Sequence, residues 1–174
     1  VPLLADAHLS RTLAGRDVQP GTALDFIAEV TARAAVLPAV SYAINLCEDR
    51  YQFLVTFCAV AVAGQTNLLP ASRAPQAINE VMQAYPRSYV VCERTLDLAS
   101  SRFFRVPALG DNVADFSAPV PAIAPEHVVA IGFTSGPAGA PKANPETRLL
   151  LGPSPAVKPP TPCPADPPTP AHPA

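Results

Sequence analysis

Charge is scarce in this sequence. Charged side chains make up 15% of the 174 residues, and 12 basic against 14 acidic residues give a formal net charge of −2. Proteins that bind nucleic acid neutralise its phosphate backbone with a surplus of lysine and arginine, usually gathered on one face. The sequence has no such surplus, so we expect no nucleic-acid partner.

Cysteine is sparse and unpatterned. Cys47, Cys58, Cys92 and Cys163 stand far apart, without a Cys-x-x-Cys pair or a histidine at zinc-ligand spacing. Zinc sites and the disulfide frameworks of small domains depend on such spacings. We therefore predict neither a metal site nor a disulfide framework, and expect buried, reduced thiols.

Long hydrophobic runs are missing as well. The longest, Phe53 to Ala63, is interrupted only by Thr56 and falls short of the roughly 20 residues needed to cross a bilayer. It predicts a buried helix rather than a membrane span. The segment Val1 to Ser10 lacks the basic, apolar and small-residue order of a secretory signal, so we expect a cytoplasmic protein.

The first clear element is an amphipathic helix over Leu24 to Leu37. Thr22 is a candidate N-cap, and Asp25 follows three residues later, as in a capping box. Asp25, Glu29 and Arg33 recur at every fourth position, so they are predicted to share one solvent-facing side of the helix. The apolar residues between them then face the core.

Strand-like and helix-like segments alternate after this helix. The predicted strands are 40–46, 66–69 and 88–92, and the predicted helices run from about 48 to 63 and from 72 to 84. Glu48 and Asp49 place negative charge in the first helical turn, and Gly64 ends that helix. Such alternation with short connections predicts the α/β class: a partial, mostly parallel sheet with helices on its faces.

Two groups of polar residues outside these elements have alternative interpretations. Arg102 and Arg105 flank the predicted edge strand around Phe103, and they form either an anion site or a pair of solvated charges. Glu126 and His127 precede the next apolar run, where they are either an acid/base pair or a solvated loop end. The solvated interpretation is the commoner one for both groups.

The most informative segment is a glycine-containing loop. An apolar, β-prone run at 128–132 leads into Phe-Thr-Ser-Gly-Pro-Ala-Gly-Ala-Pro-Lys at 133–142. Gly136 and Gly139 allow tight turns that bring amide N–H groups close to an anion, and Lys142 adds a positive charge. The pattern predicts binding of a nucleotide polyphosphate. The alternative is a plain connection between two strands, with Lys142 in solvent.

The loop resembles the phosphate-binding motif of the AMP-dependent synthetase and ligase family, whose usual wording is Thr-Ser-Gly-Ser/Thr-Thr-Gly-x-Pro-Lys. The matching positions are Thr134, Ser135, Gly136, Gly139, Pro141 and Lys142. Pro137 and Ala138 depart from that wording and supply neither of the two family hydroxyls, and Pro137 also lacks an N–H. We therefore expect ATP binding weakened by a few kcal/mol, since hydrogen bonds to charged groups contribute about 1.5–3 kcal/mol each.

The resemblance covers residues 22–145, where the turn Asn67 to Pro70 also looks most like acyl-CoA synthetase-type members. It implies ATP or AMP with Mg²⁺ as cofactor and a carboxylic acid as partner. The family activates the acid to an acyl-adenylate and often transfers it to coenzyme A. The resemblance makes Thr134, Ser135, Gly136, Gly139 and Lys142 the nucleotide-binding residues, and it carries over no catalytic residue and no metal ligand.

The composition changes after residue 145. Between Gly152 and Ala174 the chain carries ten of its 23 prolines, so 146–174 is predicted to be a disordered tail. The predicted organisation is therefore an N-terminal extension at 1–21, an AMP-binding part at 22–145 and this tail. We expect a truncated or frame-shifted, catalytically incomplete product. The alternatives are a non-catalytic interaction module, in which Pro159 to Pro162 offers a Pro-x-x-Pro spacing to a polyproline-recognition partner, and an unstable remnant.

Overall fold

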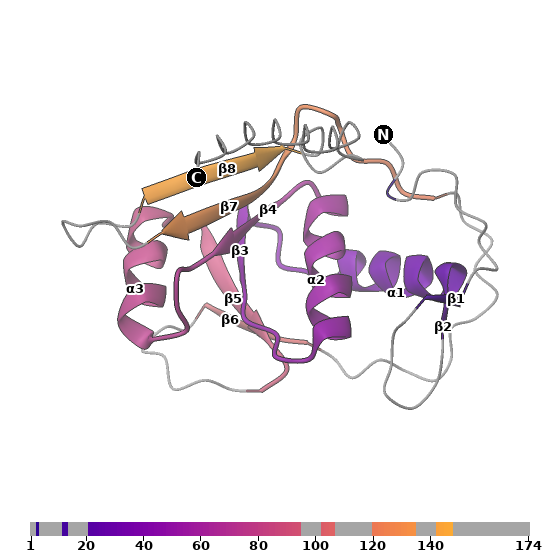
Figure 1. The fold of residues 1–174 in the computed structure, drawn as a ribbon, viewed down its shortest axis with the longest axis horizontal. Coiled ribbons are helices and arrows are strands. Elements are labelled where there is room, and N and C mark those ends of the chain that lie inside the picture. The colour runs from indigo at the N-terminus through magenta and orange to yellow at the C-terminus, as the bar shows by residue number, and fades with distance from the viewer. Residues whose placement is uncertain are drawn as a thin grey trace, which may run out of the picture.

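The computed structural model describes residue 3 and residues 12–13, 21–94, 102–106, 120–134 and 142–147. Its centre is a six-stranded sheet with the strand order β6-β5-β3-β4-β7-β8 (Figure 1). The strands are β3 (Tyr42–Asn45), β4 (Thr66–Leu69), β5 (Ser88–Cys92), β6 (Phe103–Arg105), β7 (Val128–Thr134) and β8 (Lys142–Thr147). Two short strands, β1 (Thr12–Leu13) and β2 (Gly21–Thr22), form a separate antiparallel pair.

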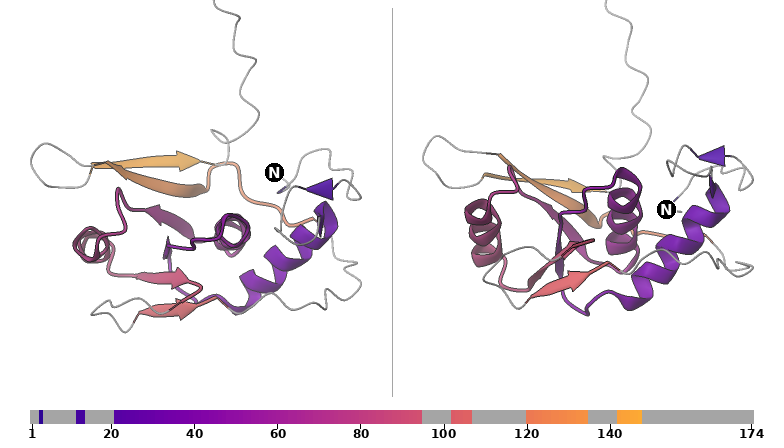
Figure 2. Two further views of the ribbon diagram at one scale, coloured as in Figure 1. Left: turned by 60° about the horizontal axis from the view of Figure 1, so that its bottom comes forward. Right: turned by 90° about the horizontal axis from the view of Figure 1, so that it is seen from below.

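Three helices accompany the sheet: α1 (Ala23–Val36), α2 (Arg50–Val62) and α3 (Pro75–Ala84). The helix α2 connects β3 to β4, and α3 connects β4 to β5. The two helices lie on opposite sides of the sheet (Figure 2). Within the six-stranded sheet every strand pair is parallel except β7–β8, so the predicted α/β class with a mostly parallel sheet is confirmed.

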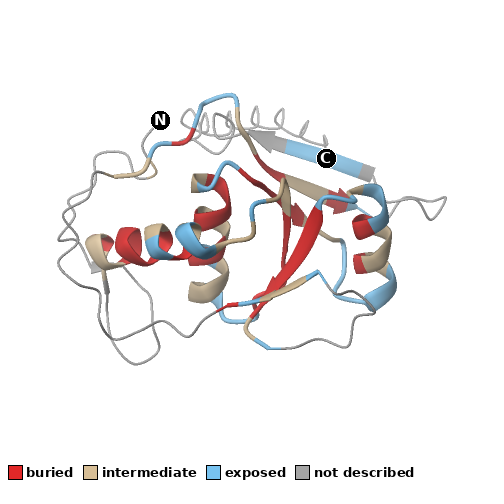
Figure 3. Cartoon of the chain, turned by 180° about the vertical axis from the view of Figure 1, so that it is seen from behind, coloured by how far each residue is buried: buried red, intermediate tan, exposed pale blue. Residues whose placement is uncertain are grey.

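The central strands are apolar on both faces because helices cover both. Figure 3 shows β3, β4 and β5 almost entirely buried. On the α3 side, Ile44, Leu68 and Val90 pack with residues of that helix. On the other side, Ala43 and Val91 pack with Val60 of α2. Near-continuous apolar runs are typical of parallel strands buried in this way.

The predicted helix ends are largely confirmed. Thr22 caps α1 through a capping box, in which its hydroxyl accepts from the Asp25 amide (3.2 Å) and the Asp25 carboxylate accepts from the Thr22 amide (2.8 Å). Asp49 is the N-cap of α2 rather than a first-turn residue, and it accepts from the Gln52 amide (2.7 Å). Gly64 ends that helix with φ of 70°, in the left-handed region where glycine is favoured.

One prediction about α1 is wrong. Glu29 and Arg33 were expected to face solvent, but they are only 6% and 3% exposed. The helix α2 packs along this side of α1, and the Arg33 guanidinium donates to Thr56 Oγ1 (2.7 Å) and Gln52 Oε1 (2.7 Å). Burial lowers the pKa of Arg33 from its ordinary value. The recurrence of charged residues at every fourth position identified one side of the helix. It could not show that a second helix covers that side.

Other predictions concern the sheet edge and the thiols. β6 pairs only with β5 and is therefore an edge strand, as expected. Cys47 and Cys92 are buried free thiols, as expected, whereas Cys58 is only half-buried and Cys163 lies outside the described residues. Within the described ranges, none of the helices has the length and apolar character required to cross a membrane. The predicted tail at 146–174 lies outside the description apart from residues 146–147.

Candidate functional site

The glycine loop connects the two strands of a hairpin. β7 runs parallel to β4, with Asn67 opposite Ala130, and β8 returns antiparallel to β7, with Thr134 opposite Lys142. Residues 135–141 therefore join the strands beyond the carboxyl end of β7. In open α/β sheets, ligands bind outside the carboxyl ends of the parallel strands. The topology thus puts the loop at the end of the sheet where a ligand is expected.

The predicted nucleotide-binding residues are only partly within the described structure. Thr134 is the last residue of β7 and is exposed. Lys142 is the first residue of β8, directly across from Thr134. The Lys142 side chain and residues Ser135, Gly136 and Gly139 lie outside the described residues, so their contacts with phosphate stay a prediction.

Asn67 anchors the hairpin strand to the rest of the fold. Its side chain is fully buried, and its Nδ2 donates to the carbonyl oxygens of Phe57 in α2 (3.1 Å) and Val129 in β7 (3.0 Å). The neighbouring Thr66 Oγ1 donates to the Val128 carbonyl (2.7 Å). One polar side chain thus joins β4, α2 and β7.

Sequence reasoning placed Asn67 in the predicted strand 66–69 and in a family-like turn, but it missed this structural role. The available signal was an amide side chain inside a short apolar strand, because buried polar groups require hydrogen-bond partners. A second anchor is aromatic: the Phe133 ring, next to Thr134, makes an edge-on contact with Tyr85 at 5.7 Å between centroids. The base of the loop is therefore held by packing as well as by hydrogen bonds.

Glu126 and His127 do not belong to this site. They precede β7, whereas the glycine loop follows it, and seven residues of strand separate the two ends by roughly 20 Å. The His127 Nε2 lies 2.9 Å from the Gln65 carbonyl oxygen, and Glu126 is exposed. The solvated loop-end interpretation holds for Glu126, and His127 is a half-buried structural residue.

Arg102 and Arg105 are likewise bound within the protein. Arg102 donates to the Pro86 carbonyl, and Arg105 Nε donates to the Glu93 carbonyl (3.1 Å). Both are exposed residues at the β6 edge, as the solvated interpretation requires. Among the residues described here, no group of three or more His, Cys, Asp or Glu side chains could hold a metal ion.

Comparisons by sequence find no match: no protein-family model and no curated protein matches the chain. Comparison of structures does find matches. The fold is that of the N-terminal part of adenylation domains and of a coenzyme A synthetase. The predicted resemblance to adenylate-forming enzymes is thus confirmed at the level of the fold.

Three solved structures illustrate this similarity. The N-terminal subdomain of NpsA from Klebsiella oxytoca, in complex with 3-hydroxybenzoyl-AMSN, has a TM-score of 0.63 and 19% identity, over 79% of this chain and 37% of that one. The structure of McyG A-PCP complexed with phenylalanyl-adenylate has a TM-score of 0.54 and 15% identity, over 74% of this chain and 24% of that one.

The third is O-succinylbenzoate coenzyme A synthetase (MenE) from Bacillus subtilis, in complex with AMP. Its TM-score is 0.50 and its identity 16%, over 77% of this chain and 38% of that one. The chain thus spans less than two-fifths of the length of each of these structures. At such low identity the comparison defines the fold, and the activity has to be argued from the site.

Proposed function

We propose that this chain is the phosphate-binding N-terminal part of an adenylate-forming, acyl-CoA synthetase-like protein. The observation that carries the proposal is the position of the loop at 135–141. It follows β7 at the carboxyl end of a parallel sheet, within a fold that otherwise matches solved adenylate-forming structures. Its residues also follow the phosphate-binding wording of that family at six positions.

The loop acts by binding and orienting nucleotide. In this proposal, backbone amides around Gly136 and Gly139 and the hydroxyls of Thr134 and Ser135 are the donors to phosphate oxygens. Lys142, at the start of the opposite strand, supplies the positive charge. ATP supplies the α-phosphate that a substrate carboxylate attacks, giving an acyl-adenylate and pyrophosphate. The hydrogen bonds to β7 and the ring contact of Phe133 hold the strand from which the loop starts.

The part of the chain that we assign to this fold does not complete the reaction alone. The described residues offer neither a metal site nor an acid/base pair beside the loop. We propose that the carboxylic acid, and a thiol acceptor such as coenzyme A, are bound by the remainder of a full-length adenylate-forming domain. The expected property of this chain is therefore nucleotide binding without turnover.

Isothermal titration with MgATP tests the assignment. We expect measurable but weak binding by the wild type, and at least about fivefold weaker binding by Lys142→Ala, because one charged contact to phosphate is lost. Lys158→Ala in the predicted tail is the matched control and should bind like the wild type. A Lys142→Ala variant that binds as tightly as this control contradicts the assignment.

A gain of affinity provides a sharper test. The double substitution Pro137→Ser and Ala138→Thr restores both family hydroxyls and one backbone N–H. We expect it to tighten MgATP binding by about tenfold or more, because each new hydrogen bond to phosphate contributes about 1.5–3 kcal/mol before losses to solvent. Unchanged affinity, or no detectable heat at millimolar nucleotide in either protein, removes nucleotide binding as the function of this loop.

A further inference from the structure

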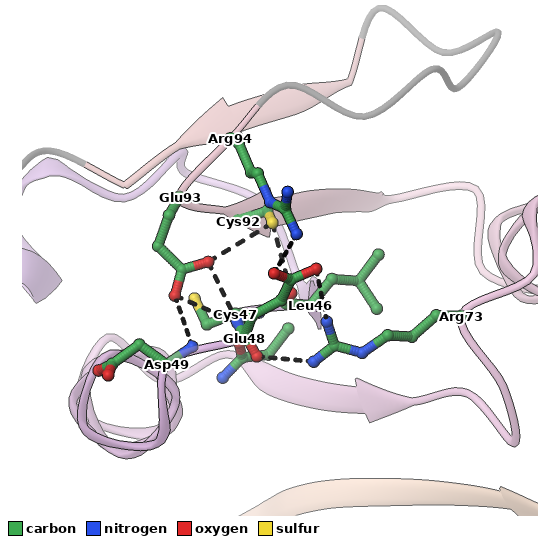
Figure 4. A network of polar contacts seen from close by, with 9 residues as sticks. Leu46, Cys47, Glu48, Asp49, Arg73, Cys92, Glu93 and Arg94 are labelled. Atoms are coloured by element: carbon green, nitrogen blue, oxygen red, sulfur yellow. Dashed lines mark hydrogen bonds and ion pairs between the residues drawn. The ribbon is translucent and has the colours of Figure 1, made fainter.

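A second polar cluster lies where β3 and β5 end, away from the glycine loop. After β3, the chain adds β4 on one side of β3 and then crosses over to add β5 on the other side. The direction in which strands are added therefore reverses between β3 and β5. Open α/β sheets leave a crevice at such a point. In this protein Glu93, the residue after β5, reaches across to the turn between β3 and α2 (Figure 4). We propose that the Glu93 carboxylate is a salt-sensitive clasp that holds this turn closed.

The clasp consists of one carboxylate on two successive backbone amides. Glu93 Oε1 lies 3.1 Å from the Glu48 nitrogen and 3.2 Å from the Asp49 nitrogen, and Oε2 lies 3.1 Å from the Glu48 nitrogen. These amides precede the first turn of α2, for which Asp49 is the N-cap. A carboxylate that accepts from amides makes shorter and stronger hydrogen bonds than a neutral acceptor. Glu93 thus joins segments about 45 residues apart along the sequence.

The charges around Glu93 strengthen the same connection. The Glu48 carboxylate binds Arg94 and lies 3.5 Å from Arg73, and the two arginines reach it from different directions (Figure 4). Arg73 also donates to the Cys47 carbonyl (2.7 Å). The Arg94–Glu48 pair therefore joins the same two segments as the Glu93 carboxylate, and Arg73 holds Glu48 from the connection after β4.

The clasp has a consequence for ligand binding. The amides of Glu48 and Asp49 are occupied by an internal anion, so this crevice is closed to an external phosphate. The end of the sheet at the β7–β8 hairpin is left as the place for nucleotide. The assignment of nucleotide to the hairpin rests on the proposed function, whereas the clasp does not, because the contacts that define it lie entirely within residues 46–94.

Ionic strength should act on the clasp because the ion pairs of Glu48, which lie beside the Glu93 carboxylate, face solvent. The side chains of Glu48, Arg73 and Arg94 are 46%, 54% and 65% exposed. Interactions between such exposed charges are screened by salt. The strand core beneath them, which includes Ile44 of β3 and Val91 of β5, is buried and apolar. Salt should therefore open the turn without unfolding the sheet.

Hydrogen–deuterium exchange with mass spectrometry on the full chain tests the proposal. We expect Glu93→Gln to speed exchange in peptides covering residues 46–53 at least about fivefold, as fits the loss of a charge-assisted acceptor near solvent. Peptides of α3 should not change. Glu126→Gln removes an exposed carboxylate elsewhere and is the matched control. Equal exchange at 46–53 in Glu93→Gln and Glu126→Gln overturns the proposal, as does a similar increase in α3.

The salt arm uses the wild type, so it remains decisive if the substituted chain does not fold. Raising the ionic strength to about 1 M shortens the Debye length to about 3 Å. We expect faster exchange at residues 46–53 in the wild type, and a smaller increase in Glu93→Gln, where only the ion pairs of Glu48 remain to be screened. Wild-type exchange at 46–53 that is insensitive to salt overturns salt control of the clasp.

Discussion

The buried arginine of α1 allows a quantitative test of how the two helices are joined. Arg33 is 3% exposed, and its guanidinium donates to Thr56 Oγ1 and Gln52 Oε1, each at 2.7 Å. Arg33→Met keeps much of the aliphatic stem and removes both bonds, together with a longer third bond from Nη1 to the Gln52 carbonyl (3.3 Å). Hydrogen bonds to a charged group contribute about 1.5–3 kcal/mol each. Part of this loss is offset because the variant no longer pays the desolvation penalty of a buried cation. We expect the free energy of unfolding to fall by about 2–4 kcal/mol.

Urea unfolding followed by far-UV circular dichroism measures this loss by linear extrapolation. Arg87→Met, at an exposed position, is the matched control and should change the free energy of unfolding by less than about 0.5 kcal/mol. A double substitution of Arg33→Met with Thr56→Val should cost at least about 1 kcal/mol less than the sum of the two single substitutions, because both partners of one bond are removed together. An Arg33→Met protein as stable as the control refutes the reasoning.

Three further predictions follow from single positions. Asn67→Ala should lower the free energy of unfolding by about 2–4 kcal/mol, measured in urea, because it leaves two buried carbonyls without their donor. Gly64→Ala should lower the free energy of unfolding by about 1 kcal/mol, because φ is 70° at this position. Gly132→Ala should be tolerated, because the nearest atom to an added Cβ is 4.0 Å away. Equal urea midpoints for the two variants would refute this prediction. Burial raises the pKa of Cys47 from 9.0 to about 12. As the pH rises, the thiol loses its proton in the unfolded chain before it does so in the folded chain. The contribution of this group to the free energy of unfolding is therefore fully present below about pH 9 and is lost as the pH rises toward about 12. Cys47→Ala should flatten that fall in urea titrations between about pH 8 and about pH 11, although not fully, because burial also raises the pKa of Cys92.

Most of the fold follows from signals that act over a few residues. The bounds predicted for β4 and β5 agree with the structure to the residue, because short apolar runs there are cut by proline and flanked by helix signals. The capping box of Thr22 and Asp25 and the stop at Gly64 are local backbone chemistry. Such features depend on neighbours within about four positions and need no knowledge of tertiary packing.

The errors arise where distant segments meet. Glu29 and Arg33 have the spacing of a solvent-facing stripe, yet α2 covers them. Hydrophobic periodicity shows which side of a helix is more apolar. It does not show how many other helices or strands pack against that helix. The role of Asn67 was missed for the same reason, since its two acceptors belong to an adjacent helix and an adjacent strand.

The sequence by itself determined the α/β alternation, the helix ends and the glycine loop with its family-like wording, because each is a property of neighbouring residues. Only the tertiary structure decided that β7 lies parallel to β4 in the sheet, that Arg33 is buried between two helices, and that the Glu93 carboxylate meets the amides of Glu48 and Asp49. The physical reason is that burial and hydrogen bonding are set by residues far apart in the chain, such as Asn67 and Val129, which are 62 positions apart. Their proximity is a result of folding and leaves no local pattern in the sequence.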